Sequence, residues 1–230
     1  MPILYVASTG SNTSPYDTWA TAATTLLTAT AAAVAGDTIY MHGESFVISA
    51  TTTYTLAGTS AAPVKLFCTN DKVNEPPTVL STSGVVDASG TVGVTISVNG
   101  CGYIYGVEFI SGGGTNAASI NISTGDDREV EAEFCKFTIA NSNNGSRIFF
   151  GADNAANKSL RTKNCTFTFG NSALQGFSCA ADWFSDGDTF KKTTTSPNVL
   201  FKANYRANST RVNAGDFTDM TGALFGAGLY

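Results

Sequence analysis

The stretch VEAEFCKFTIA, residues 130–140, and the stretch LRTKNCTFTFG, residues 160–170, share one design. In each, a cysteine, a phenylalanine and a third apolar residue alternate with polar residues: Cys135, Phe137 and Ile139 in the first, Cys165, Phe167 and Phe169 in the second. Alternation with a period of two predicts a β-strand that buries one of its faces. How often this strand recurs along the chain therefore indicates which all-β fold to expect.

The phenylalanine strand recurs along the second half of the chain. Its phenylalanines are Phe109, Phe137, Phe167, Phe190 and Phe217, at intervals of 28, 30, 23 and 27 residues. The residues two positions earlier are Val107, Cys135, Cys165, Asp188 and Gly215. A second strand-like segment, such as VTISV or SRIFFG, precedes each of these strands, and turns rich in Gly, Asn, Asp and Ser separate them.

Several short strands in each unit of 23–30 residues predict an all-β solenoid. We expect a single-stranded right-handed parallel β-helix, in which like residues of successive coils form internal ladders. Phe109, Phe137 and Phe167 would form one ladder, and Cys135 and Cys165 a neighbouring one. The alternative is a β-sandwich whose strands happen to contain phenylalanine.

The N-terminal segment has a different pattern. Residues 17–36, DTWATAATTLLTATAAAVAG, predict a capping α-helix of about four turns, with Asp17 or Thr18 as N-cap and Gly36 as the stop. No linker or charge run divides the chain, so we expect one domain over residues 1–230. In it, residues 1–36 hold the first strand and the helix, residues 37–220 the coils, and residues 221–230 a C-terminal tail.

This N-terminal order resembles the opening of right-handed parallel β-helix proteins of the pectin-lyase-like superfamily. The matching residues are Tyr5-Val6, Gly10-Ser11, Trp19 to Ala35 and Gly36-Asp37-Thr38-Ile39-Tyr40. The resemblance implies that the helix caps the open end of the β-helix and that the GDTIY segment begins the first full coil. It implies little about activity, because such scaffolds host unrelated functions.

His42 is the only histidine in the chain and follows the GDTIY segment directly. We expect it to be an exposed residue at a strand end rather than a catalytic base.

Composition excludes several classes of protein. Charged residues make up only 13% of the chain, against about 25% in an ordinary domain, and the net charge is −5 without a basic cluster. Nucleic-acid binding is therefore not expected. No apolar run approaches the roughly 18 residues of a membrane span, and the N-terminus does not read as a secretory signal. We expect synthesis in a cytoplasm.

The cysteines do not predict a metal site. There are five, Cys68, Cys101, Cys135, Cys165 and Cys179, with no CxxC motif. A zinc site is not expected, because the cysteines form no closely spaced pair and the chain has only one histidine, and a cytoplasmic origin argues against disulfides. We expect small buried apolar side chains, and neither a metal nor a cofactor.

Acidic residues occur at two places that could bind or act on a glycan. Asp126 and Asp127 lie in the turn STGDDREVE, and Asp182, Asp186 and Asp188 lie around DWFSDGD. Paired carboxylates can serve as acid and base or hold calcium, but adjacent aspartates on a turn are usually only solvated. Trp183 could stack on a sugar ring, although packing between coils is the stronger interpretation.

The catalytic motifs of the pectin-cleaving enzymes are missing. The paired aspartates and the NTD, GHG and RIK segments of the hydrolases do not occur, and no close match to the lyase motifs is present. The chain is therefore not expected to be an enzyme, with a polysaccharide lyase or hydrolase as the alternative.

The tail FTDMTGALFGAGLY has the best candidates for contact with another subunit. These are Leu224, Phe225, Leu229 and Tyr230, which stand among glycines. A solenoid needs its open end covered, either by its own chain or by a partner.

The sequence leads to one principal functional hypothesis and two alternatives. We expect a structural virion protein, and among these a bacteriophage capsid decoration protein rather than a tail protein, since the chain resembles the short β-helix modules found in both. It would dock on other virion proteins and form a homo-oligomer, with a trimer as one candidate state. The alternatives are a glycan-active enzyme and a glycan-binding module, with Tyr103, Tyr105 or Trp183 as platforms. A line of aromatic or carboxylate side chains along one outer face favours glycans, whereas a flat, sparsely charged face favours protein docking.

Overall fold

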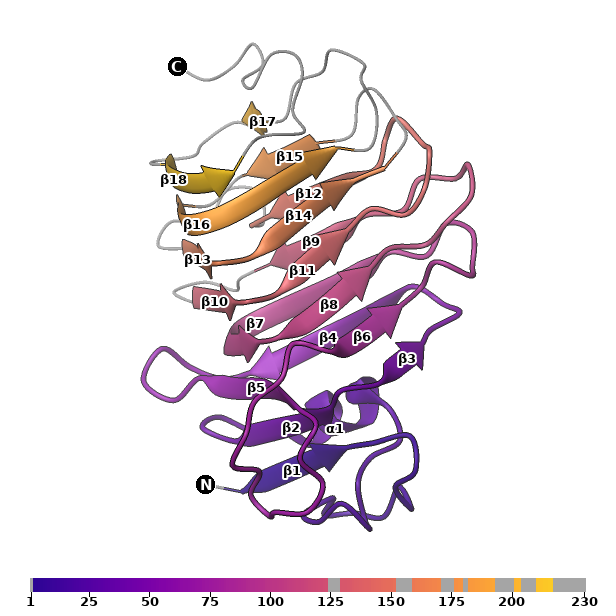
Figure 1. Ribbon diagram of the computed structural model, residues 1–230, viewed down its shortest axis with the longest axis vertical. Coiled ribbons are helices and arrows are strands. Elements are labelled where there is room, and N and C mark those ends of the chain that lie inside the picture. Colours follow the sequence, from indigo (N-terminus) through magenta and orange to yellow (C-terminus); the bar gives the residue numbers. More distant parts are fainter. Residues whose placement is uncertain are drawn as a thin grey trace.

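The computed structural model of the chain describes residues 2–123, 129–151, 159–170, 176–179, 182–192, 201–203 and 210–216. Within these residues, short strands stack along the long axis of the molecule, from the N-terminal coil to the C-terminal coils (Figure 1). Pairing is parallel between all the named strands, and non-consecutive strands are neighbours. The fold is an all-β parallel solenoid, and the prediction of this class is confirmed.

Each coil contributes strands to three faces. Face 1 consists of β1 (Ile3–Val6), β2 (Thr38–His42), β5 (Val64–Thr69), the end of β7 (Ile96–Tyr105), β10 (Glu129–Glu133), β13 (Ser159–Lys163), the start of β16 (Asp182–Lys192) and β18 (Thr210–Asp216). Face 2 consists of β3 (Ser45–Val47), β6 (Gly84–Asp87), β8 (Val107–Ile110), β11 (Lys136–Thr138), β14 (Thr166–Phe169) and the end of β16. Face 3 consists of β4 (Thr52–Ala57), the start of β7, β9 (Ile120–Ser123), β12 (Arg147–Phe150), β15 (Gly176–Cys179) and β17 (Phe201–Ala203).

The predicted phenylalanine ladder lies inside face 2. Phe109, Phe137, Phe167 and Phe190 are in register on successive strands and are buried. Their ring centroids are 5.8, 5.2 and 5.2 Å apart and their planes differ by only 11–12°. This ladder is confirmed as far as Phe190, and Phe217 lies outside the described residues.

The cysteine side chains are buried where the structure describes them. Cys68, Cys101, Cys135 and Cys165 are free thiols inside the solenoid, as expected. Burial raises the pKa of the Cys165 thiol, and the adjacent Cys135 adds to the effect. The side chain of Cys179 lies outside the described part of the chain.

A second inner ladder, behind face 1, changes from apolar to polar. Ile39, Leu66, Ile104 and Ala132 are in register and buried, and the next residues of this ladder are Thr162 and Ser185. Buried hydroxyl groups need hydrogen-bond partners, and the partner here is a buried carboxylate described below.

The capping helix is shorter than the sequence predicted. Only Leu26–Ala32 form α1, and the N-cap is Thr25, whose side chain accepts a hydrogen bond from the Thr28 N–H. The expected caps, Asp17 and Thr18, and the expected stop, Gly36, are therefore wrong. The threonines lower helix propensity, and residues 18–25 are held in a loop by distant partners instead.

Helix α1 still covers the N-terminal end of the core. Leu26, Ala29 and Thr30 are buried, and the helix contacts β4, β1 and β2. It thus lies against strands of face 1 and face 3 at the start of the stack (Figure 1).

Candidate functional site

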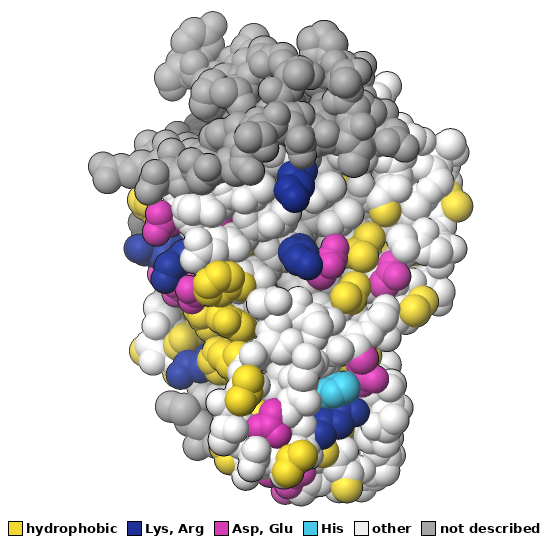
Figure 2. All heavy atoms as spheres, viewed as in Figure 1, with side chains coloured by type: hydrophobic (Ala, Val, Ile, Leu, Met, Phe, Trp, Pro, Cys, Tyr) yellow, Lys and Arg dark blue, Asp and Glu magenta, His cyan; other side chains and the backbone are white. Residues whose placement is uncertain are grey.

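The outer side of face 1 has a line of aromatic side chains. Alternation along each strand turns Tyr40 of β2, Phe67 of β5, and Tyr103 and Tyr105 of β7 away from the core. Register places Tyr40 opposite Phe67 and Phe67 opposite Tyr105. Figure 2 shows the corresponding hydrophobic band left of centre on the face in view.

We call these four side chains, together with Phe134, the outer aromatic band. Ring centroids are 5.8 Å apart for Tyr40–Phe67, 5.6 Å for Phe67–Tyr103 and 5.5 Å for Tyr105–Phe134. The interplanar angle is 29° for the first pair, but 59° and 62° for the others, so of these three pairs only Tyr40 and Phe67 are stacked.

The N-terminal end of the band is closed by Trp19. Its ring lies 4.6 Å from that of Tyr5, which in turn stacks on Tyr40 at 6.0 Å. The Trp19 N–H of the backbone donates to a Glu75 carboxylate oxygen at 2.6 Å. Burial raises the pKa of Tyr5 to about 12, with the charge of Glu75 adding to the effect.

Strand β10 adds carboxylates beside the aromatic rings. Glu131 is opposite Tyr103, and Glu133 is opposite Tyr105. The Tyr103 hydroxyl donates to Glu133 Oε2 at 2.6 Å, and Lys163 Nζ lies 3.1 Å from Glu133 Oε1. The Tyr103 hydrogen bond and the Lys163 charge hold the pKa of Glu133 below its ordinary value against the effect of burial.

Cations of β13 follow in the next coil. Arg161 forms an ion pair with Glu129 and lies over the ring of Phe184, 5.1 Å from its centroid. Along face 1 the outer surface therefore changes from aromatic at β2, β5 and β7 to acidic at β10 and basic at β13.

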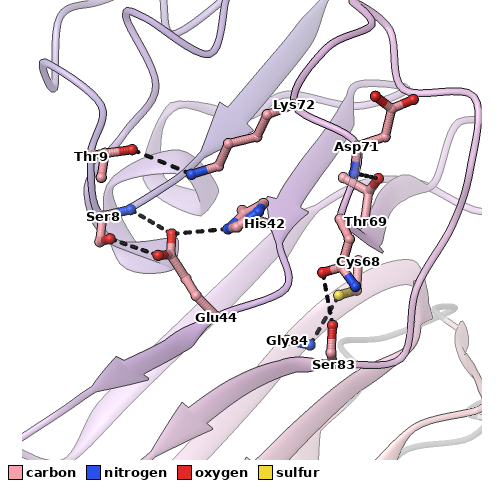
Figure 3. A network of polar contacts seen from close by, with 11 residues as sticks. Ser8, Thr9, His42, Glu44, Cys68, Thr69, Asp71, Lys72, Ser83 and Gly84 are labelled. Carbon is pink, nitrogen blue, oxygen red and sulfur yellow. Dashed lines mark hydrogen bonds and ion pairs between the residues drawn. The ribbon is translucent and has the colours of Figure 1, made fainter.

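His42 belongs to a separate polar network at the N-terminal end (Figure 3). Ser8 donates to Glu44 through its backbone N–H and its hydroxyl, both at 2.7 Å, and Glu44 Oε1 lies 3.5 Å from His42 Nδ1. Lys72 Nζ donates to Thr9 Oγ1 at 3.3 Å. The network joins the loop after β1, the end of β2 and the loop after β5.

The order of groups in this network differs from that of a Ser–His catalytic pair. Such a pair needs the imidazole next to the hydroxyl, whereas here the carboxylate of Glu44 lies between Ser8 and His42. Burial and the charge of Lys72 lower the pKa of His42, which favours the neutral ring. The ring is only partly exposed and has Trp19 at its edge, so His42 ends a strand as expected but is not fully exposed.

The predicted acidic site is only partly within the described residues. Asp126 and Asp127 lie outside them, as does the side chain of Asp182. Asp186 is exposed on β16, opposite Lys163 in the register of face 1. The structure thus places Asp186 on the same outer side as the outer aromatic band.

Trp183 is not a surface platform. Its side chain is 0% exposed, in register with Leu160, and packs 5.0 Å from Phe177 and 5.3 Å from Phe150 between ring centroids. The suggestion that it binds a sugar is wrong because both faces of the ring are inside the core. The packing interpretation is confirmed.

The sequence interpretation missed the burial of Asp188. The carboxylate accepts hydrogen bonds from the hydroxyls of Thr162 and Ser185 and from the Cys165 N–H. The Trp183 indole N–H donates to Thr162 Oγ1 at 3.0 Å and extends the network. The repeat in the sequence indicated this burial, since Asp188 stands two residues before the ladder phenylalanine, where Cys135 and Cys165 stand in earlier coils.

The expected docking residues, Leu224, Phe225, Leu229 and Tyr230, all lie outside the described residues. Among the residues that are described, no group of three or more His, Cys, Asp or Glu side chains is arranged to hold a metal ion. The part of the chain seen in the structure also contains no helix with the length and apolar character of a membrane span.

The chain matches no protein-family model, no curated protein and no solved structure.

Proposed function

We propose that the protein binds a glycan, without cleaving it, along the outer side of face 1. The observation that carries this proposal is the outer aromatic band, which the strand register aligns over successive coils next to Glu131 and Glu133. A line of aromatic and carboxylate side chains on one outer face is the feature that separates glycan binding from flat protein docking.

The chemistry of the band suits sugar rings. A pyranose has apolar C–H faces, which pack on aromatic rings, and hydroxyl groups, which need hydrogen-bond partners. Tyr side chains offer both an apolar body and a polar tip, and carboxylates accept hydrogen bonds. Neighbouring coils are about 4.8 Å apart along the stack, so the outer aromatic band extends over several coils and can contact an extended polymer.

Glu133 supports binding over hydrolysis. A glycosidase needs a carboxyl group that stays protonated near neutral pH to act as the general acid. The pKa of Glu133 is lowered by the Tyr103 hydroxyl and Lys163, so its carboxylate is ionised there. It is therefore suited to accept hydrogen bonds from hydroxyl groups rather than to donate a proton.

Affinity electrophoresis and calorimetry against a panel of soluble polysaccharides test the proposal. We expect one class of polysaccharide to retard the protein, and Tyr105→Ala to weaken that affinity by about tenfold or more. The matched control is Phe149→Ala, which removes an outward-facing aromatic ring from β12 on face 3. Binding of no polysaccharide, or equal losses in the two variants, would contradict the proposal.

We also propose a setting for this activity, the surface of a bacteriophage particle. The resemblance to β-helix virion modules and membership of the pectin-lyase-like superfamily remain part of the proposal. Parallel pairing of the backbone from β1 to β18 supports it, because paired backbone resists unfolding and proteolysis on an exposed particle. The partners would be capsid or tail proteins and further copies of this chain, reached after synthesis in the host cytoplasm.

A further inference from the structure

The turn between face 1 and face 2 has the same unusual backbone conformation in successive coils. Gly106, Phe134, Asn164 and Gly187 each have positive φ, at 74°, 52°, 52° and 65°. Backbone hydrogen bonds fix the turn: Gly106 N donates to Glu133 O, Phe134 N to Lys163 O and Asn164 N to Asp186 O, at 2.9–3.0 Å. The stacking of coils therefore imposes this conformation whatever the side chain.

Phe134 is the exception among these residues. Glycine has no Cβ to clash in the left-handed region, and asparagine adopts it more readily than most residues. A bulky aromatic residue is disfavoured there. An outlier of this kind is kept where surrounding structure enforces it, and such outliers gather at binding sites.

Burial of the ring does not account for phenylalanine at this position. The side chain is 40% exposed, whereas the ladder phenylalanines of face 2 are fully buried. Its described ring contact is with Tyr105, 5.5 Å away at an interplanar angle of 62°. The two rings form an outward-facing aromatic corner at the edge of the outer aromatic band.

We propose that Phe134 is a ligand-contact residue, and that the corner of Phe134 and Tyr105 stacks against an uncharged pyranose ring. The inference rests on the proposed glycan binding and names the ligand class. Glu133 lies opposite Tyr105 in the next coil and is negatively charged. Lys163 already forms an ion pair with Glu133, so its charge is balanced before a ligand binds. A neutral sugar is thus favoured over a uronic acid, which would bring a second carboxylate to Glu133.

The repeat itself supplies the test variants. Phe134→Asn and Phe134→Gly install the residues that other coils use in this turn, and Asn164→Gly is the matched control one coil away. Thermal unfolding and binding of three probes, a neutral glucan, a neutral galactomannan and polygalacturonate, are measured for the parent and the variants.

We expect the unfolding temperature of Phe134→Asn to be unchanged or raised by about 2–4 °C, because the backbone strain is relieved. Affinity for a neutral polymer should fall by about tenfold or more in both Phe134 variants and stay unchanged in Asn164→Gly. Loss of binding without loss of stability separates a ligand contact from a structural role.

Different failures have different meanings. If the parent binds and Tyr105→Ala weakens binding but the Phe134 variants do not, the inference is overturned while the proposed function stands. If the parent binds only polygalacturonate, the neutral ligand class is wrong. If the Phe134 variants lose stability and binding together, the ring is structural. If the parent binds no polysaccharide, the proposed function fails and this inference with it.

Discussion

Asp188 places a carboxyl group inside the solenoid, surrounded by the donors Thr162, Ser185 and the Cys165 N–H. Burial raises its pKa above the ordinary value of 3.8 in spite of these hydrogen bonds, and the nearby charge of Asp186 acts in the same direction. Protonation of the Asp188 carboxyl group is therefore coupled to folding.

The coupling predicts the sign of a pH dependence. A carboxyl group with a raised pKa in the folded state binds its proton more tightly when folded, so its contribution to stability is greatest in acid. We expect that contribution to fall as the pH rises from 3.8 through the folded pKa of Asp188. Asp188→Asn, which does not titrate, should remove this part of the dependence.

Urea unfolding of the parent and of Asp188→Asn across a pH series measures the effect. Groups with lowered pKa, such as Glu44 and Glu133, give the opposite slope but are common to both proteins, so the difference isolates Asp188. Parallel curves for the two proteins would contradict the prediction.

The repeat in the sequence strengthens the packing interpretation of Trp183 and also predicts that Asp188, which was missed, faces the core. Trp183 precedes Phe190 by 7 residues, as Leu160 precedes Phe167 (190 − 183 = 167 − 160), and Asp188 precedes Phe190 by 2, as Cys165 precedes Phe167. The repeat therefore indicated that both side chains face the core. Their place in the repeat predicts the direction of these two side chains better than their position in the acidic segment DWFSDGD does.

At the scale of the element, the phenylalanine ladder is the most uniform part of the core. Phe137 stacks on Phe109 and on Phe167 and is completely buried. We expect Phe137→Ala to lower the free energy of unfolding by about 3–5 kcal/mol, because it leaves a cavity between two coils.

Chemical denaturation followed by circular dichroism measures that loss. Lys136→Ala on the same strand is the control, since its side chain is half exposed and its ion pair with Glu108, at 3.9 Å, is of the weak surface kind. A loss below about 1 kcal/mol for Phe137→Ala would mean that the neighbouring coils collapse into the space.

The capping helix shows why element boundaries were harder to predict. Its length is limited by contacts made far along the chain: the Trp19 N–H bonds Glu75, and Ala23 forms a bridge with Val6. Local propensity alone contains no information about a carboxylate 56 residues away. The repeat of the coils and the presence of a capping helix were visible in the sequence, while the bounds of that helix were not.

At the scale of the whole molecule, the outer aromatic band was predicted only in part: Tyr103 and Tyr105 were named as platforms for a glycan, whereas Tyr40, Phe67 and Phe134 were not. Tyr40, Phe67 and Tyr103 come from coils of unequal length, because loops of different size separate β2, β5 and β7. The recurring alternation around each phenylalanine, at intervals of 23–30 residues, made the inner ladders visible, but the alignment of these outer rings depends on a register that only the structure supplies.

The proposed docking tail gives a prediction about assembly. Deleting residues 221–230 should weaken oligomer formation or attachment to particles more than it weakens the isolated fold. Light scattering of the parent and the truncated chain, alone and mixed with intact particles, measures oligomer formation and attachment. Thermal unfolding of the two proteins measures the stability of the isolated fold. Equal losses of both would show that the tail is part of the fold rather than a docking segment.

The placement of the two tryptophans gives the molecule a built-in optical reporter at each end. Trp19 packs on Tyr5 over the first coil, and Trp183 lies among the phenylalanines of the late coils. Fluorescence of Trp19→Phe and Trp183→Phe variants would follow one end of the stack each. Coincident unfolding curves would mean that the coils melt as one cooperative unit, and separated curves would reveal which end opens first.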